Sequence, residues 1–286
     1  MNADTIQGHF PVLLREFFCQ RLLTHRGASP QTVKSYRDAF RLFLRFVEAR
    51  TKKSPTEITL TDFDTDLVLA FLDHLETDRG NSVRTRNSRL TAIRSFMHYV
   101  SLRDPTSLPI AQRVLAIPTK RFDRPLLGFL SREEMEAIIQ APNVATWSGR
   151  RDQVLFATFY NTGGRVSELV GLNVGDIALN GSAFVRFEGK GRKERAIPLW
   201  RSTVRRLRQW LTEIDLTPTS PVFPNRTRNR LTRSGVEYRL RVAVREATVD
   251  CPSLEAKNIS PHTLRHTTAM ALLQAGVPLT TIALWL

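Results

Sequence analysis

A pair of glycines followed by an arginine places the strongest constraint on how this chain can fold. The apolar run over residues 154–160 is typical of a buried helix, and Gly163 and Gly164 end it before a new apolar-periodic segment starts at Val166. Arg165 is therefore expected at a turn between helices, with its side chain directed into a cleft. A guanidinium is always charged, and its planar fork matches two oxygens of one phosphate. The alternative interpretation is a surface arginine in an ordinary helix–helix turn.

A second basic group lies far downstream, over residues 260–266 (SPHTLRH). Ser260 followed by Pro261 predicts a helix start, with serine as the N-cap and proline at the first helical position. His262 and Arg265 are then three residues apart on one helix face, at a helix N-terminus that favours negative charge. Such a pair suits an anion that gains or loses a proton during a reaction. A histidine that only caps the helix is the alternative.

Between these two groups, residues 184–199 (FVRFEGKGRKERAIPL) alternate on either side of a Gly-Lys-Gly turn. This pattern predicts a β-hairpin. Lys190 is expected at its tip, on a loop that could swing over a bound phosphate. A solvated basic turn is the alternative.

Taken together and in this order, TGGRVSEL, GKGRKER and HTLRH resemble the catalytic domain of the tyrosine recombinases, the family of phage integrases and Xer-type resolving enzymes. The resemblance covers about residue 130 to the end and, more weakly, the N-terminal part. It implies that Arg165 and Arg265 are the family's two catalytic arginines. Lys190 matches the family's hairpin lysine, and His262 matches the histidine of its H-x-x-R box.

The sequence departs from the family pattern in two places. Gly164 stands where leucine or methionine is usual, which implies a packing difference. The family's second histidine (or tryptophan) and its nucleophilic tyrosine are expected just beyond Leu286, after the apolar helical segment Thr280–Leu286, which needs a covering segment. We therefore expect a catalytic domain truncated before the nucleophile. The motif order gives that role to none of the tyrosines present, which are Tyr36, Tyr99, Tyr160 and Tyr238.

The net charge of +15 and the pI near 10.9 predict a polyanionic partner, and double-stranded DNA is the first candidate. The excess is shared about equally by the two halves of the chain. No apolar run reaches the length of a membrane span, and no signal peptide is evident. Cys19 and Cys251 lack metal-ligand spacing, so we expect reduced, mostly buried thiols of a cytoplasmic protein.

The N-terminal part predicts four helices. They cover residues 9–24, residues 31–50 after Ser29-Pro30, a segment starting at Thr61 and Asp64, and residues 82–103. On the second helix Arg37, Arg41 and Arg45 recur every four residues. Such a row could follow a DNA backbone, but it is equally consistent with a solvated face.

The fourth helix and the segment after it contain most of the predicted DNA contacts. Basic residues surround its apolar stripe without acidic neighbours, and short polar side chains lie between them, a mixture that suits close approach to DNA. A merely solvated face is the alternative. Residues 105–125 hold four prolines and predict a linker that crosses the DNA backbone. The predicted DNA-binding residues are Arg84, Arg86, Asn87, Arg89, Arg94, Lys120 and Arg121.

The fold class predicted for the whole chain is mainly α. It consists of an N-terminal four-helix core-binding domain over residues 1–104, the linker over 105–125, and a mainly helical catalytic domain over 126–286 with a small antiparallel sheet. In the second domain, Ser131 with Glu134 forms a capping box, a first strand is expected near Ile177 to Leu179, and further helices cover residues 202–214 and 236–247.

The chemistry that this set of residues suits is phosphoryl transfer on DNA. Attack on a backbone phosphate spreads negative charge over its oxygens, and Arg165 and Arg265 stabilise that charge more than the ground state. Lys190 is the candidate general acid for the leaving 5′ oxygen, and His262 assists proton transfer at the nucleophile. The family forms a covalent 3′-phosphotyrosine, which conserves the phosphodiester energy, so no cofactor is expected. The sequence contains no cluster of carboxylates of the kind that a two-metal nuclease needs, so no metal is expected.

The sequence therefore predicts a site-specific DNA recombinase that lacks its tyrosine in this chain and is inactive in strand cleavage. By the resemblance, the full-length enzyme acts as a homotetramer on two DNA duplexes. The first alternative is a DNA-binding regulator or mobile-element remnant without catalysis. The second is a metal-dependent nuclease using His262 and His266, although no acidic ligands accompany these histidines.

Overall fold

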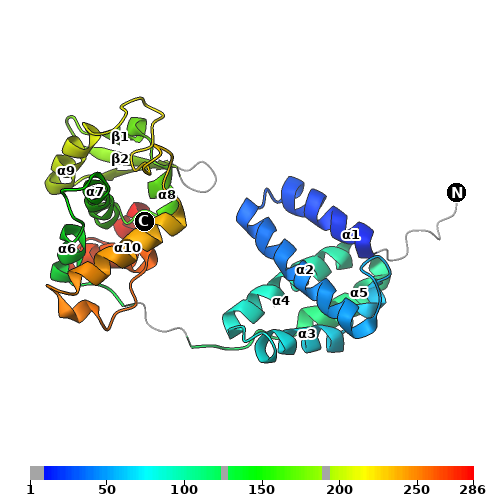
Figure 1. Ribbon diagram of the computed structural model, residues 1–286. Helices are drawn as coiled ribbons and strands as arrows, with labels where there is room; N and C mark the ends of the chain where they lie inside the picture. Colours follow the sequence, from blue (N-terminus) through cyan, green and yellow to red (C-terminus); the bar gives the residue numbers. More distant parts are fainter. Residues whose placement is uncertain (1–9, 124–127, 189–193) are drawn as a thin grey trace. The chain divides into compact units, whose positions relative to one another are not determined.

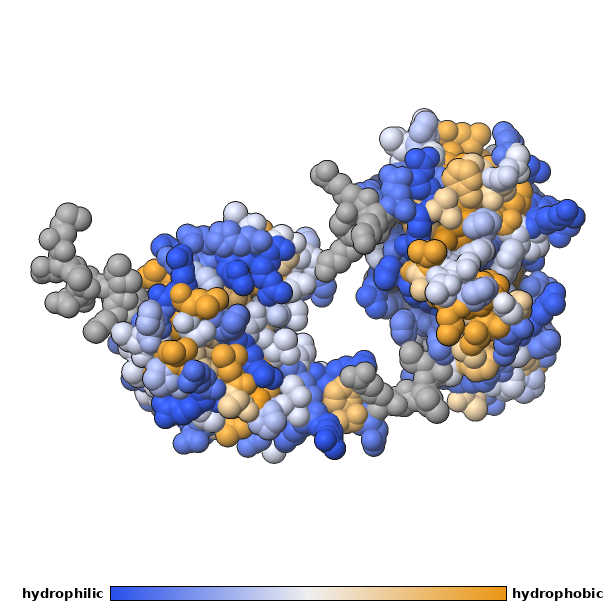
Figure 2. All heavy atoms as spheres, turned by 180° about the vertical axis from the view of Figure 1, so that it is seen from behind, coloured by the Kyte–Doolittle hydropathy of each residue, from blue (hydrophilic) through white to orange (hydrophobic). Residues whose placement is uncertain are grey.

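The chain divides into two compact units, Met1–Arg124 and Pro125–Leu286 (Figure 1). The structure is a computed structural model that describes residues 10–123, 128–188 and 194–286. Hydrophilic side chains cover much of each unit on the face seen in Figure 2, with smaller apolar areas between them. Within the described ranges, no helix combines the length and apolar character needed to cross a membrane.

The first unit is entirely helical in its described part, and short polar caps set where its helices begin. Ser29, Asp64 and Ser82 each accept a hydrogen bond from the backbone N–H three residues on, which satisfies a free donor of the first turn. Asp64 alone caps the third long helix, and the predicted role of Thr61 is wrong. The elements are α1 (Phe10–Glu16), η2 (Phe17–His25), α2 (Pro30–Thr51), η3 (Leu60–Asp62), α3 (Thr65–Thr77), α4 (Val83–Arg103), η4 (Pro105–Ser107) and α5 (Leu108–Ala116).

Helix α4 provides the centre of this unit's core through Phe96. The Phe96 ring contacts the rings of Phe10, Phe17 and Phe40 at centroid distances of 5.7, 5.5 and 5.3 Å, each edge to face. All four side chains are buried. Edge-to-face aromatic pairs add to the stabilisation from area burial, so this cluster joins the first helical segment, α2 and α4.

The apolar spacing of the first helical segment predicted a single α-helix, and this prediction is wrong. After α1 the chain continues as the nine-residue π-helix η2, in which turns are longer than in an α-helix. Phe17 and Leu22 are five residues apart and both fully buried. The i→i+5 turn brings them onto one face, where an α-helix would separate them. Cys19 lies on η2 and is exposed, so the expectation of a buried thiol is wrong at this position.

Residues 105–116 are not the linker that their prolines suggested. Pro105 and Pro109 occupy the first turns of η4 and α5, where a missing N–H costs nothing. Ala111, Val114 and Ile117 are buried in the core of the first unit. The first compact unit therefore extends well beyond residue 104, and its boundary with the second lies between Arg124 and Pro125.

Several predicted DNA-binding residues instead hold this unit together. Arg86 is 3% exposed; its Nε lies 3.5 Å from a Glu76 carboxylate oxygen, and its Nη1 donates to Asn87. The Asn87 amide donates to the carbonyl of Lys120 and accepts from its N–H, at 2.8 and 3.1 Å. The Lys120 ammonium in turn binds Glu76 at 2.6 Å. Arg86 is buried and Asn87 uses its amide on the Lys120 backbone, so both have structural roles inside the unit, and their contact with DNA stays a prediction.

Arg89 also has an internal role, since its Nη1 donates to the carbonyl of Ser35 at 3.0 Å and links α4 to α2. The sequence pattern could not separate these arginines from solvated ones because Glu76 and Ser35 lie on other helices. Arg84, Arg94 and Arg121 form no ion pair with any residue that the structure describes. These three remain predicted DNA contacts.

The second unit surrounds the buried helix α7, which is drawn near its middle in Figure 1. A three-stranded antiparallel sheet with the order β1-β2-β3 lies beside it, and in its register Val185 faces Ile197 and Phe187 faces Arg195. The elements are α6 (Arg132–Gln140), α7 (Trp147–Thr162), α8 (Val166–Gly171), η5 (Val174–Asp176), β1 (Ile177–Ala178), β2 (Phe184–Glu188), β3 (Glu194–Pro198), α9 (Arg201–Leu211), α10 (Arg233–Ala247), η6 (Pro252–Leu254), α11 (Pro261–Gln274) and α12 (Leu279–Trp285). The predicted mainly α class with a small antiparallel sheet is confirmed.

A buried charged group fixes α7 to its neighbours. Asp152 is fully buried and binds its neighbour Arg151 at 2.7 Å and Arg239 of α10 through its other oxygen. Arg151 also donates to the carbonyl of Pro224 at 2.9 Å. Two segments distant in sequence, the chain at Pro224 and α10, are thus held at the first turns of α7.

The replacement of Arg86 by alanine is expected to destabilise the first unit by about 2 kcal/mol, because it removes the buried partner of Glu76, which keeps only Lys120, and the hydrogen bond to Asn87. All four tryptophans, Trp147, Trp200, Trp210 and Trp285, belong to the second unit. Chemical denaturation followed by far-ultraviolet circular dichroism, which reports on both units, should show the lower stability of the first unit. Tryptophan fluorescence, which reports on the second unit, should be unchanged. Arg84→Ala on the exposed face of α4 is the control, with a change within about 0.5 kcal/mol. Equal free energies of unfolding of the first unit in both variants would contradict a structural role for Arg86.

Candidate active site

The two glycines after α7 allow three elements to meet closely. Gly163 ends α7 in the left-handed region, at φ +58°, and its N–H donates to the Phe159 carbonyl at 2.7 Å. A Cβ atom on Gly163 would lie 2.3 Å from the Leu286 side chain, and one on Gly164 would lie 3.0 Å from the Phe187 ring. The departure from leucine or methionine at Gly164 thus has a local reason, since Phe187 of β2 occupies the space.

Arg165 follows as the N-cap residue of α8, and its side chain is 58% exposed. Its backbone N–H donates to one oxygen of Glu168 at 2.7 Å, and its Nη1 donates to the other at 2.9 Å. Glu168 thus holds both the backbone and the guanidinium of Arg165. Arg165 is therefore held at its backbone N–H and at Nη1, while most of its guanidinium faces solvent.

Arg265 reaches the same turn from α11. Ser260 caps this helix by accepting from the Thr263 N–H, with Pro261 in the first turn, as predicted. The Nη1 of Arg265 donates to the carbonyl of Gly163 at 2.7 Å, and its Nη2 donates to the carbonyl of Leu286. Burial lowers the pKa of Arg265, and the nearby positive charge of Arg165 lowers it further. The first and last arginines of the predicted set thus share one turn.

Arg195 of β3 is a third arginine at this place, and it is not among the catalytic residues predicted from the sequence. Its Nη1 and Nη2 donate to the two oxygens of Glu168 at 3.1 and 2.7 Å, and its Nε donates to the carbonyl of Trp285 at 3.1 Å. Its guanidinium lies over the Phe187 ring, 5.0 Å from the centroid. Its position opposite Phe187 in the hairpin register was the available signal, because it places Arg195 on the buried face beside the glycine turn.

Glu168 is the negative centre of the cluster. Burial alone would raise its pKa, but hydrogen bonds from Arg195 and from the backbone and side chain of Arg165 outweigh this and hold the pKa at about 2. The carboxylate is therefore ionised at neutral pH. Three guanidiniums against one carboxylate leave an excess of two positive charges, which suits an anion.

The other two predicted catalytic residues are placed differently. His262 lies in the first turn of α11 with an exposed side chain, and it has no hydrogen-bond or ionic partner among the described residues. It is three positions before Arg265 on the same helix, as predicted. Lys190 lies outside the described residues.

Comparison with known proteins agrees with this geometry. Residues 128–286 match the model of the phage integrase family, and residues 16–103 match the phage integrase N-terminal SAM-like domain. The chain belongs to the phage integrase family. The two matches also correspond to the two compact units, so both parts of this integrase-family chain have relatives.

Curated relatives of this integrase-family chain extend over nearly its whole length. The putative integrase/recombinase y4rC of Sinorhizobium fredii is 47% identical over 274 residues, which cover 96% of this chain and 82% of that protein. The tyrosine recombinase XerC of Pelobacter propionicus is 34% identical over 266 residues, covering 93% of this chain and 83% of the relative. The resemblance to tyrosine recombinases is thereby confirmed.

Solved structures support the fold. The XerH site-specific recombinase bound to palindromic difH substrate matches with a TM-score of 0.70 and 23% identity, covering 91% of this chain and 74% of XerH. A lambda integrase tetramer bound to a Holliday junction matches with a TM-score of 0.67 and 18% identity, covering 99% of this chain and 75% of that one. At these identities the likeness concerns the fold.

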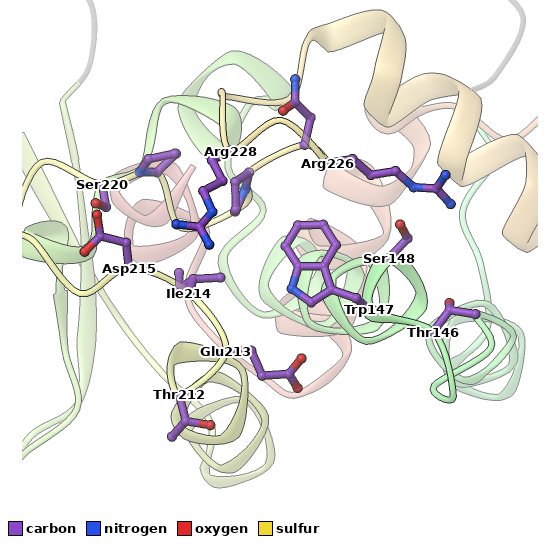
Figure 3. Close-up of a pocket in the computed structure, with 13 residues that line it drawn as sticks. Thr146, Trp147, Ser148, Thr212, Glu213, Ile214, Asp215, Ser220, Arg226 and Arg228 are labelled. Atoms are coloured by element: carbon purple, nitrogen blue, oxygen red, sulfur yellow. The ribbon is translucent and has the colours of Figure 1, made fainter.

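A separate pocket with a volume of about 780 Å³ lies at the other end of α7 (Figure 3). Trp147 lies between Arg226 and Arg228, which come from the loop before α10. Neither arginine has an ionic partner among the described residues, and Arg228 adopts φ 61°. A helix of 16 residues is about 24 Å long, so this pair of cations lies far from Glu168.

The low pKa of Glu168 predicts a specific pH dependence of stability in the second unit. Because the folded-state pKa is about 2 and the ordinary value is 4.5, the stabilisation is present above pH 4.5 and lost as pH falls towards 2. It amounts to about 3 kcal/mol. Denaturation followed by tryptophan fluorescence should show the wild type losing its advantage over Glu168→Gln across this range.

The matched control is Glu188→Gln, an exposed carboxyl on β2. It should follow the wild-type pH profile. A constant difference between wild type and Glu168→Gln from pH 7 to pH 2 would contradict the ionic role of Glu168.

Proposed function

We propose that this protein performs site-specific DNA recombination, cleaving and rejoining strands through a covalent 3′-phosphotyrosine. The observation that carries this proposal is the meeting of Arg165 and Arg265 at the Gly163 turn. Two guanidiniums from helices far apart in sequence, with a net positive charge around them, form a receptor for one phosphate. Membership of the phage integrase family supports the same reaction.

The reaction needs stabilisation of charge that develops on the phosphate oxygens. Arg165 presents its exposed guanidinium to one side of the phosphate, and Arg265 contributes from α11. In this proposal both bind the transition state more tightly than the ground state, which is what accelerates the reaction. His262, exposed beside Arg265, assists proton transfer at the nucleophile, and Lys190 protonates the leaving 5′ oxygen. No cofactor enters this scheme, because the phosphotyrosine retains the bond energy.

The tyrosines of this chain are poor candidates for the nucleophile. Tyr36 and Tyr99 lie in the first unit, and Tyr160 packs edge to face against Trp200 at 5.1 Å. Tyr238 is exposed on α10. Among the described residues, none of the four tyrosines is hydrogen-bonded to Arg165, Glu168 or Arg265. We therefore propose that these 286 residues bind DNA without forming a covalent adduct. The same observation favours a second candidate function, a DNA-binding regulator without catalysis.

The substrate we propose is double-stranded DNA, contacted by arginines that the fold leaves unpaired. In the first unit these include Arg37, Arg41 and Arg45, which are exposed at four-residue spacing on α2 and have no ionic partner among the described residues. In the second unit Arg226 and Arg228 are equally free. Free guanidiniums on one helix face can neutralise successive phosphates. Together with Arg84, Arg94 and Arg121, they are the basic residues that we propose as the principal DNA contacts.

We also propose a homotetramer on two DNA sites as the working assembly of the full-length enzyme, acting in the cytoplasm. The support comes from structural neighbours, since XerH is bound to its difH substrate and a lambda integrase tetramer is bound to a Holliday junction.

Charge reversal of Arg37, Arg41 and Arg45 together should weaken duplex DNA binding by at least about tenfold at low salt. The slope of log affinity against log salt should become shallower by about 0.9 for each phosphate that the protein no longer neutralises. Fluorescence anisotropy of a labelled duplex at several salt concentrations measures both quantities.

The control for this experiment is Arg113→Glu, a single charge reversal at an exposed position of α5 away from the row, and it is compared with the single reversal Arg41→Glu. Arg86→Ala is unsuitable because it alters folding. Unchanged slopes for the α2 variant would show that this face of α2 is merely solvated.

Arg165→Ala should reduce strand cleavage by about 10²-fold or more, because it removes one stabilising donor at the phosphate. The DNA site is first selected from random duplexes that the wild-type protein retains. Protein expressed from its complete gene is then mixed with a nicked suicide substrate carrying that site, and the DNA-linked protein is quantified by denaturing electrophoresis.

The 286-residue chain is run beside it and should give no linked band. A band from this chain would show that one of its four tyrosines is competent. Absence of a band from every form, with DNA binding intact, would favour the regulator. Cleavage by Arg165→Ala at the wild-type level would remove Arg165 from the proposed site.

A further inference from the structure

The side-chain hydrogen bonds to Glu168 are divided unequally between two arginines, with two from Arg195 and one from Arg165. Its two oxygens accept four donors, which are the N–H and Nη1 of Arg165 and the Nη1 and Nη2 of Arg195. Arg195 forms the parallel two-bond arrangement that is strongest between a guanidinium and a carboxylate. Arg165 gives the carboxylate only one side-chain nitrogen.

Exposure separates the two arginines further. The side chain of Arg165 is 58% exposed, whereas that of Arg195 is 17% exposed and that of Glu168 is 9%. All three nitrogens of the Arg195 guanidinium have acceptors, since Nε binds the carbonyl of Trp285. The Nε and Nη2 of Arg165 have no acceptor among the described residues. These are two adjacent donors of the planar fork that matches a pair of phosphate oxygens.

We propose that Arg195 is a positioning residue for the phosphate site, because it satisfies Glu168 and so leaves the Nε and Nη2 of Arg165 free for a DNA phosphate. This rests on the proposed function in taking a phosphodiester as the anion at Arg165. Without Arg195, Glu168 would be a buried carboxylate with one cationic partner. It would then draw the Arg165 fork into its own two-bond pair, because an underpaired buried charge is costly.

The net charge of the cluster leads to the same conclusion. Arg165, Arg195 and Arg265 with Glu168 carry a total of +2. Removal of Arg195 leaves +1 and places Glu168 in direct competition with the phosphate for Arg165. The removal of Glu168 as well restores +2 and abolishes the competitor. A role limited to packing over Phe187 or to holding α12 predicts no such compensation, and α12 has a separate anchor in the bond from the Trp285 indole to the Asn161 carbonyl.

The test is a double-mutant cycle on the 286-residue protein with dimethyl phosphate, a monoanionic phosphodiester, as the probe. Binding is followed through the ¹⁵N–¹H signal of Arg165 Nε, which needs no knowledge of the DNA site. Arg195→Ala should weaken the apparent affinity by about tenfold, the effect of losing about one charge-assisted interaction. Arg195→Ala combined with Glu168→Gln should recover to within about twofold of wild type.

Arg195→Lys should give a partial loss, because a lysine keeps the charge but not the two-bond geometry. Arg245→Ala, an exposed arginine on α10, is the control for the change in net charge and should bind as the wild type does. Thermal unfolding of each variant, followed by tryptophan fluorescence, verifies that the second unit is folded.

The outcomes distinguish this inference from the proposed function. Probe binding at Arg165 that Arg195→Ala leaves unchanged, or that Glu168→Gln fails to restore in the double variant, overturns the role of Arg195 alone. No response of the wild-type Arg165 signal to the probe overturns the phosphate site itself, and the inference with it.

Discussion

The carboxylate of Glu168 is the interaction on which the second unit's basic site depends. The guanidiniums from the turn before α8, from β3 and from α11 would repel each other, and burial of Arg265 makes that repulsion stronger. A single ionised carboxylate with a pKa of about 2 offsets it while leaving an excess of positive charge. A neutral residue at this position would lose the attraction, and a second carboxylate would halve the excess positive charge from +2 to +1.

Steric space is the second requirement, and the two glycines provide it. The positive φ of Gly163 turns the chain sharply from α7 into α8, and the missing side chains let α11, α12 and β2 approach. Because α11 packs closely against the backbone of the turn, Arg265 can donate a hydrogen bond to the carbonyl of Gly163. The same two residues thus end a helix, admit its neighbours and orient one arginine of the site.

The features that depend on residues close together in the sequence, such as helix caps and short motifs, were predictable from the sequence. Ser29, Ser82 and Ser260 fix helix starts through bonds within one turn, and Arg165 and Arg265 stand in motifs with definite spacing. What could not be predicted depends on partners remote in sequence. Arg86 and Asn87 look like surface residues of a basic helix until Glu76 and Lys120 are placed beside them. Arg195 lies four residues after the predicted Gly-Lys-Gly turn, yet its role depends on Glu168 and Trp285. The π-helical turn at Phe17 depends on core packing.

The contacts of α5 and Asn87 also bear on how readily such proteins can be recombined by engineering. Residues 108–120 belong physically to the first unit, through buried Ala111 and Val114 and through both hydrogen bonds between Asn87 and Lys120. A hybrid that joins the first unit of one relative to the second unit of another should therefore be joined after Asp123. A junction at the end of α4, where the proline-rich stretch begins, would replace the α5 segment that packs against α4. The apolar face of α4 would then be exposed in the hybrid.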